Sequence, residues 1–178
     1  MTEREHLMPI IVKHFNSLGY YCVLECMVAG YCDVVACKWS ERVGRRIPTL
    51  LDAIAIELKI SNIASVISQS HWNLYHVNAS YAAMPLEFCR KMKNKSLEAF
   101  KDKGVGLLGV DTEIREVTTI IESKRNLKCE NELLASRLWK NKVRNRDKME
   151  QLLNGESSDL LPLQTTIEPV WRVTKTHN

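Results

Sequence analysis

Long hydrophobic runs are missing from this sequence. No stretch of about 18 consecutive apolar residues occurs, so the sequence predicts no membrane-spanning segment. The first residues, Met-Thr-Glu-Arg-Glu-His, contain no apolar core of the kind that a signal peptide requires. We therefore expect a cytoplasmic protein that makes no membrane contact.

Glycine and proline are also scarce, with seven and five residues in a chain of 178. Flexible or low-complexity linkers are rich in these residues, so the sequence leaves little room for them, and no internal repeat is visible. A composition of 45% hydrophobic and 26% charged residues indicates one globular domain with an appendage. The net charge of +4 permits binding to nucleic acid without requiring it.

Two kinds of site lack their usual sequence signals. No Ser or Cys stands in a nucleophile elbow or beside a recognisable partner, so covalent catalysis is not expected. Of the cysteines at positions 22, 26, 32, 37, 89 and 129, the first four are separated by three, five and four residues, but they fall on expected strands, whereas the C-x(2–4)-C pairs of zinc sites usually lie in turns. Buried thiols in a reducing compartment are the simpler interpretation, and a zinc-stabilised interaction domain is the alternative that this cluster leaves open.

The most informative segment present is residues 53–60, Ala-Ile-Ala-Ile-Glu-Leu-Lys-Ile. Its aliphatic residues alternate with the others, and a period of two predicts a β-strand with one buried face. The other face carries two alanines, then Glu57 and Lys59. Small residues beside a charged pair leave room for a ligand or substrate to approach.

A second strand-like segment carries Asp33, in Tyr-Cys-Asp-Val-Val-Ala. A hairpin would bring Asp33 beside Glu57, and two carboxylates with a lysine can hold a hard divalent cation and position a water. The alternative is an exposed cross-strand ion pair, which contributes little to stability. Asp52 is a rival for the first acid, but five residues from Glu57 it would face the other side of a straight strand.

The remaining periodicity predicts elements in the order α-β-β-β-α-β-α-β. The expected helices cover residues 5–18, 61–78 and 86–103. The last two expected strands cover residues 80–84 and 104–111. Residues 114–121 fit either a strand or the start of a helix. A long basic helix is expected over residues 131–153, so we predict a core at 1–121, a helical extension at 122–158 and a tail at 159–178.

Asp33 followed by Glu57-Leu58-Lys59 resembles the PD-(D/E)XK nuclease superfamily, which has the restriction-endonuclease-like fold. The resemblance covers residues 3–111 in the order and type of elements, αβββαβ. Cys32 stands where the family usually has a proline. The resemblance implies an α/β protein with a mixed central sheet flanked by helices, and the C-terminal helical extension lies outside it.

By the same resemblance, the protein would be a metal-dependent DNA endonuclease, similar to Holliday-junction resolvases or DNA-repair nucleases. Asp33 and Glu57 would bind Mg2+ or Mn2+ together with the backbone carbonyl of Leu58. Lys59 would stabilise charge on the phosphate or orient the attacking water. A non-catalytic nucleic-acid-binding or assembly module on the same fold is the alternative, but a retired site would be expected to lose one of the three residues.

Several further residues are candidates on family grounds. Many members place a Gln or Lys where Gln69 stands, near the metal site or the DNA. Some members also carry a Glu on the first helix, and Glu5 fits this position better than Glu3. Glu25, on the first hairpin, is an additional candidate ligand or a partly exposed strand residue. Trp72 is expected in the core rather than stacked on a base.

Basic residues gather in two regions that could contact DNA. Arg45 and Arg46 lie in the expected loop between the second and third strands. Four more share one face of the C-terminal helix at steps of three and four, namely Arg137, Lys140, Arg144 and Lys148. The alternatives are a solvated charged face or the interface of a homodimer.

Overall fold

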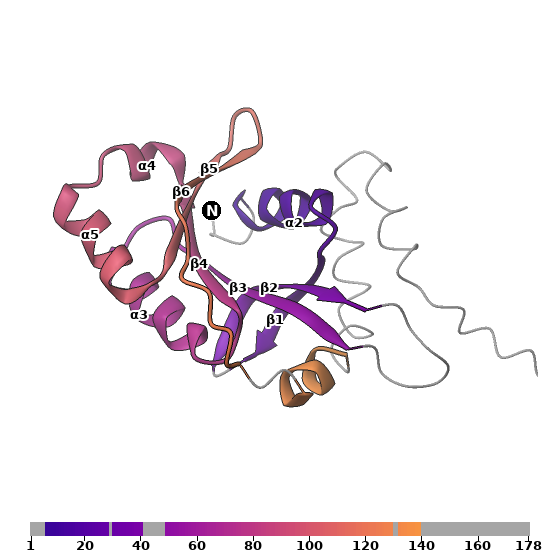
Figure 1. Ribbon diagram of the computed structural model, residues 1–178. Helices are drawn as coiled ribbons and strands as arrows, with labels where there is room; N and C mark the ends of the chain where they lie inside the picture. The colour runs from indigo at the N-terminus through magenta and orange to yellow at the C-terminus, as the bar shows by residue number, and fades with distance from the viewer. Residues whose placement is uncertain (1–5, 29, 41–48, 130–131, 140–178) are drawn as a thin grey trace, which may run out of the picture.

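The computed structural model describes residues 6–28, 30–40, 49–129 and 132–139 (Figure 1). Several residues named above lie outside these ranges, namely Glu3, Glu5, Arg45, Arg46, Lys140, Arg144 and Lys148. Most of the expected C-terminal helix lies outside them too. Among the described helices, none is long and apolar enough to cross a membrane.

The fold is α/β, with helices on both faces of one mixed six-stranded sheet (Figure 1). The strands lie in chain order: β1 (Tyr21–Met27), β2 (Tyr31–Trp39), β3 (Leu50–Leu58), β4 (Ala79–Pro85), β5 (Gly106–Asp111) and β6 (Glu116–Ile121). The first three strands and the β5–β6 pair are antiparallel, whereas β3, β4 and β5 run parallel. The expected order of elements through β4 is therefore confirmed, as is the following strand β5. Residues 114–121, which fit either a strand or a helix start, contain the strand β6.

The labelled helices are α2 (Met8–Ser17), α3 (Ile63–Leu74), α4 (Leu86–Arg90) and α5 (Asn94–Lys103). A further helical segment covers residues 132–139. Figure 1 shows α2 on one face of the sheet and the 132–139 helix on the opposite face. The buried apolar residues form one cluster under α2 and two clusters on the other face, one beneath the 132–139 helix and one beneath α3 and α5.

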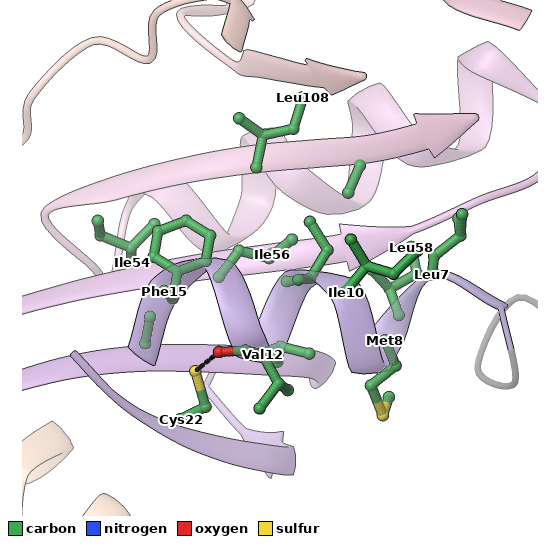
Figure 2. Close-up of a cluster of buried hydrophobic side chains, with 14 of the residues drawn as sticks. Leu7, Met8, Ile10, Val12, Phe15, Cys22, Ile54, Ile56, Leu58 and Leu108 are labelled. Carbon is green, nitrogen blue, oxygen red and sulfur yellow. Dashed lines mark hydrogen bonds between the residues drawn. The ribbon is translucent and has the colours of Figure 1, made fainter. Parts of the chain in front are cut away.

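The α2 cluster fixes which way β3 faces (Figure 2). Ile54, Ile56 and Leu58 point into this cluster against α2, where they are at most 6% exposed. Because strand side chains alternate, Glu57 must point to the opposite face, toward α3. The helix itself ends where the sequence predicts, because Gly19 adopts a left-handed φ of +78°.

One element differs from the expectation. A single helix over residues 86–103 is wrong, because α4 ends at Arg90 and α5 begins at Asn94. The apolar side chains explain the break: Met92 and Leu97 are five positions apart, which does not fit one face of a continuous helix. Two shorter helices let both residues pack on the same cluster.

Candidate functional site

Asp33 and Glu57 meet where β2 and β3 separate. The β2–β3 pairing ends at Val34 opposite Ile56, so the next position on each strand is Asp33 and Glu57. At that point the Leu58 N–H donates to Asp33 Oδ2 over 2.9 Å. The side chain of Asp33 thus holds the backbone beside Glu57, and the structure brings together the two carboxylates that the sequence singles out.

Glu57 is almost fully buried, with 2% of its surface exposed. Asn73, on α3, donates from Nδ2 to Glu57 Oε1 over 2.6 Å. Burial, and after it the nearby charge of Asp33, raise the pKa of Glu57 to about 7, against the opposing effects of the Asn73 hydrogen bond and the Lys59 charge. Glu57 therefore exchanges its proton near neutral pH, which a surface glutamate does not.

This pair suits a hard divalent cation. The charge of Asp33 raises the pKa of Glu57 because the two carboxylates repel when both are ionised, and a cation between them would remove that repulsion. Within the described ranges, no group of three or more His, Cys, Asp or Glu side chains gathers as a metal site. The side chains that could hold such a cation are Asp33 and Glu57, with the Leu58 carbonyl as the further ligand that the resemblance implies, and Mg2+ commonly uses one or two carboxylates and keeps several waters.

Lys59 follows the last residue of β3 and stays on the sheet, because its N–H donates to the Ala83 carbonyl over 3.0 Å. The strand period places its side chain on the same face as that of Glu57. Its charge lowers the pKa of Glu57. The Asp-Glu-Lys set therefore lies at one end of the β2–β3 pair.

Glu25 lies next to this set on β1. The β1–β2 register runs from Leu24 opposite Val34 to Cys26 opposite Cys32, which puts Glu25 opposite Asp33. Glu25 adopts φ +50°, a left-handed conformation that costs a non-glycine residue about 1 kcal/mol or more. The three acids stand in a row on neighbouring strands, although in the described chain they do not converge into one three-carboxylate cluster.

The helix over this site presents Asn73 to it, and the sequence does not single out that residue. Gln69, which the family resemblance selects, is exposed on α3, and Ser65 Oγ lies 3.5 Å from its Oε1. Asn73 is one helical turn further along the same side and is 3% exposed. A polar residue four positions after Gln69 is the signal that could have identified it.

We predict that the two amides differ in their effect on stability. Asn73→Ala removes the donor to a buried carboxylate, so it should lower the free energy of unfolding by about 1–3 kcal/mol at pH 8. The loss should be smaller at pH 5, where Glu57 is protonated in the folded protein. Gln69→Ala should change it by less than about 0.5 kcal/mol. Urea denaturation at the two pH values measures both, and a large loss with Gln69→Ala would show that its amide is structural.

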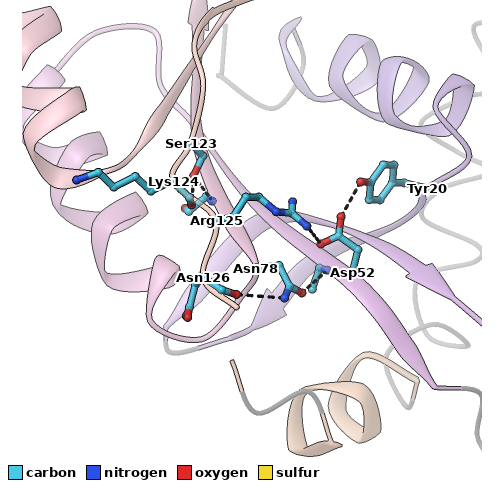
Figure 3. A network of polar contacts seen from close by, with 9 residues as sticks. Tyr20, Asp52, Asn78, Ser123, Lys124, Arg125 and Asn126 are labelled. Carbon is cyan, nitrogen blue, oxygen red and sulfur yellow. Dashed lines mark hydrogen bonds and ion pairs between the residues drawn. The ribbon is translucent and has the colours of Figure 1, made fainter. Parts of the chain in front are cut away.

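Asp52, the rival acid on β3, belongs to a separate polar network (Figure 3). Tyr20 Oη donates to one carboxylate oxygen over 2.7 Å, and Arg125 Nη2 lies 2.7 Å from the other. The segment of Arg125 is held by Asn126, whose N–H donates to the Asn78 carbonyl over 2.8 Å. Asp52 thus faces away from Glu57, and its partners give it a structural role.

The clustered cysteines do not converge on one point. Cys22 packs in the α2 cluster, whereas Cys26, Cys32 and Cys37 pack in the cluster beneath the 132–139 helix. All four are buried, and burial raises the pKa of Cys22, Cys32 and Cys37 well above the usual thiol value. These side chains are therefore protonated, apolar packing groups in this arrangement.

The structure also shows the surroundings of Trp72 and Arg137, two residues that the sequence singles out. Trp72 is not in the core: it is 59% exposed, because the buried side of α3 is formed by Val66, Ser70 and Asn73. Arg137 is exposed, and its Nη1 donates to the Val28 carbonyl over 3.2 Å. This bond attaches the 132–139 helix to the turn that joins β1 and β2.

Comparisons with known proteins place the fold but not the activity. No protein-family model matches the sequence, and no curated protein matches it. Among solved structures, the chain is similar to a protein of unknown function from Silicibacter pomeroyi. The TM-score is 0.56 at 15% sequence identity, over 88% of this chain and 95% of that one. At this identity the similarity shows a shared fold alone.

Proposed function

We propose that the protein is a metal-dependent DNA endonuclease of the PD-(D/E)XK type. The observation that carries the proposal is the buried Glu57 carboxylate, which lies beside Asp33 with Lys59 on the same face of the sheet. The fold supports it, because α2, β1, β2, β3, α3 and β4 follow one another in the αβββαβ order. In addition, β3 runs parallel to β4 across the α3 connection.

Asp33, Glu57 and the Leu58 carbonyl would hold Mg2+ or Mn2+. When bound, such a cation supplies a water of lowered pKa and positive charge beside a phosphate. The chain does the positioning: the Leu58 N–H orients Asp33, and the Asn73 amide orients Glu57. Lys59 adds a fixed positive charge that would stabilise negative charge as it develops on the phosphate.

The second candidate is a nucleic-acid-binding or assembly module without catalysis. It would not need to keep a carboxylate buried. That burial is costly because the charged form loses its solvation, and the pKa of Glu57, raised to about 7, reflects this cost. A module that only binds would be more stable with an amide or an apolar residue there. The retained Asp-Glu-Lys set therefore favours the endonuclease.

The test is cleavage of a panel of linear, flapped and four-way-junction DNAs with Mg2+, with Mn2+ and with EDTA. We expect cleavage of at least one DNA with either cation and none with EDTA. Glu116→Gln is the matched control, since it removes an exposed carboxylate from β6 and should leave cleavage unchanged. Binding to DNA without cleavage in any condition would support the non-catalytic module instead.

The pKa of Glu57 predicts how metal affinity depends on pH. Below pH 7 the folded protein carries a proton on Glu57, which a cation must displace. Affinity for Mn2+ should therefore rise with pH, by up to about tenfold per pH unit between pH 5.5 and 7, and level off near pH 8. Isothermal titration calorimetry measures this. An affinity that does not change with pH would show that Glu57 is not a ligand.

A further inference from the structure

A cavity of about 610 Å3 lies on the same face of the sheet as the carboxylate pair. Its described lining comes from α3, from the segment after β6, from the 132–139 helix and from the end of β1: Val28, Trp72, Tyr75, His76, Lys128, Leu133, Leu134 and Arg137. This volume is within the usual range of ligand pockets, about 300–1,000 Å3. The proposed nuclease chemistry does not use any of these residues.

The α3 side of the cavity is an exposed aromatic surface. Trp72 is 59% exposed and Tyr75 is 61% exposed. Their rings lie 6.1 Å apart between centroids, and the Trp72 and His76 rings lie 6.2 Å apart. Large aromatic side chains that remain this exposed, one helical turn apart, offer flat faces on which a second ring can stack.

Two lining residues of the cavity are positively charged. Lys128 is exposed, and Arg137 lines the cavity while one guanidinium nitrogen donates to the Val28 carbonyl. The described lining contains two cations and no carboxylate. Aromatic faces beside cations are the combination that binds single-stranded nucleic acid, because bases stack on the rings and phosphates pair with the charges.

Helix α3 contributes residues both to the cavity and to the carboxylate site. Trp72 lines the cavity, and the next residue, Asn73, donates to Glu57 on the sheet. A nucleotide that stacks on Trp72 would therefore contact α3 next to Asn73, the residue that binds Glu57. On the other side, Arg137 joins the cavity wall to the β1–β2 turn, and β2 carries Asp33.

We propose that this cavity binds unpaired nucleotides of the DNA substrate, so that the enzyme acts on DNA with a single-stranded segment, such as a flap or an open junction. This inference rests on the proposed function, since it names the substrate class of the same site. A double helix keeps its bases stacked inside, so only unpaired bases can reach Trp72 and Tyr75. Stacking on an aromatic ring strengthens binding of any base, because every base has a flat π face.

The test measures binding in EDTA, which separates it from cleavage. Fluorescence anisotropy of a labelled single-stranded oligonucleotide and of the matched duplex is recorded with the full-length protein. We expect tighter binding of the single strand, and Trp72→Ala should weaken that binding by about tenfold or more, whereas Trp72→Phe should largely retain it. Leu51→Ala is the control, since Leu51 has the same 59% exposure on β3 and does not line the cavity.

The salt dependence of single-strand affinity tests whether the cationic lining residues bind phosphates. Lys128→Gln should reduce the slope of log affinity against log salt by about 0.7 for the single strand, and Lys101→Gln, on α5, should not. Equal binding of single strand and duplex, or unchanged binding by Trp72→Ala, would overturn the inference even if the protein cleaves DNA. Such a result would assign the aromatic surface to a protein partner. Conversely, selective single-strand binding without cleavage would keep this site and reject the nuclease.

Discussion

Glu57→Gln should abolish metal-dependent cleavage and, in the same protein, increase the stability of the fold at pH 8. Glutamine keeps an oxygen that can accept from Asn73 Nδ2, but it removes a buried charge and a metal ligand. The pKa of Glu57 rises from 4.5 to about 7 on folding. A pKa difference of one between the folded and unfolded states corresponds to about 1.4 kcal/mol, so we expect a gain of about 1–3 kcal/mol at pH 8.

The sign of this effect follows from proton linkage. Between pH 4.5 and 7 the folded protein holds a proton on Glu57 that the unfolded chain releases, so the wild-type protein loses stability as the pH rises through this window. Glu57→Gln lacks this loss. Its advantage in urea denaturation without metal should therefore be small at pH 4.5 and complete by pH 8, and Glu116→Gln should show no such trend.

Two results would contradict the assignment. Undiminished cleavage by Glu57→Gln would remove Glu57 from the catalytic site. Equal stability of variant and wild type at every pH would mean that the carboxylate is solvated rather than buried. An inactive but more stable variant is the outcome expected for a residue that is kept for chemistry at a cost in stability.

Gly106→Ala should unfold the protein or lower its free energy of unfolding by about 3 kcal/mol or more. A Cβ at this position of β5 would clash with the Tyr81 ring at Cδ1 and stand 2.9 Å from the Ser123 backbone nitrogen. Tyr81 cannot easily move aside, because its hydroxyl donates to Glu122 over 2.7 Å. Overpacking of a filled core typically costs about 1–3 kcal/mol, and a clash with backbone raises that cost.

Gly30→Ala is the matched control for this prediction. A Cβ on Gly30, in the β1–β2 turn, would meet no atom within 4 Å, so the variant should unfold at the wild-type urea concentration. Thermal or urea denaturation of the two variants compares them directly. If Gly106→Ala were as stable as Gly30→Ala, the close approach of Tyr81 to β5 would be wrong.

The sequence predicts most of the sheet because its strands have clear period-two patterns. Alternation over residues 53–60 places Glu57 opposite the aliphatic face, and Ile56 and Leu58 are indeed buried against α2. The stop at Gly19 and the N-cap at Asn62, whose Oδ1 accepts from the Ser65 N–H over 3.2 Å, follow from local chemistry alone. These features depend on neighbours in the chain, so one sequence is enough.

Features that depend on distant packing are harder to predict. The burial of Asn73 and the exposure of Trp72 are set by the rotation of α3 against β3 and β4, which helical periodicity does not fix for a helix with polar residues on several sides. The left-handed Glu25 has no local signal either, since glycine is the residue that normally indicates such a conformation.

The segment that follows β6 has a consequence for how this domain can be divided. Counting strands would end the folding unit at Ile121, after the sixth strand. A fragment that ends there, however, would lack Arg125, which pairs with the buried Asp52. It would also lack Ser123, whose hydroxyl accepts a hydrogen bond from the Ser80 N–H. It would also release the Asn126 side chain from the Leu74 carbonyl at the end of α3. The smallest fragment that keeps the folded core intact therefore extends past Asn126 to the 132–139 helix, whose Leu134 and Leu138 are buried against the sheet.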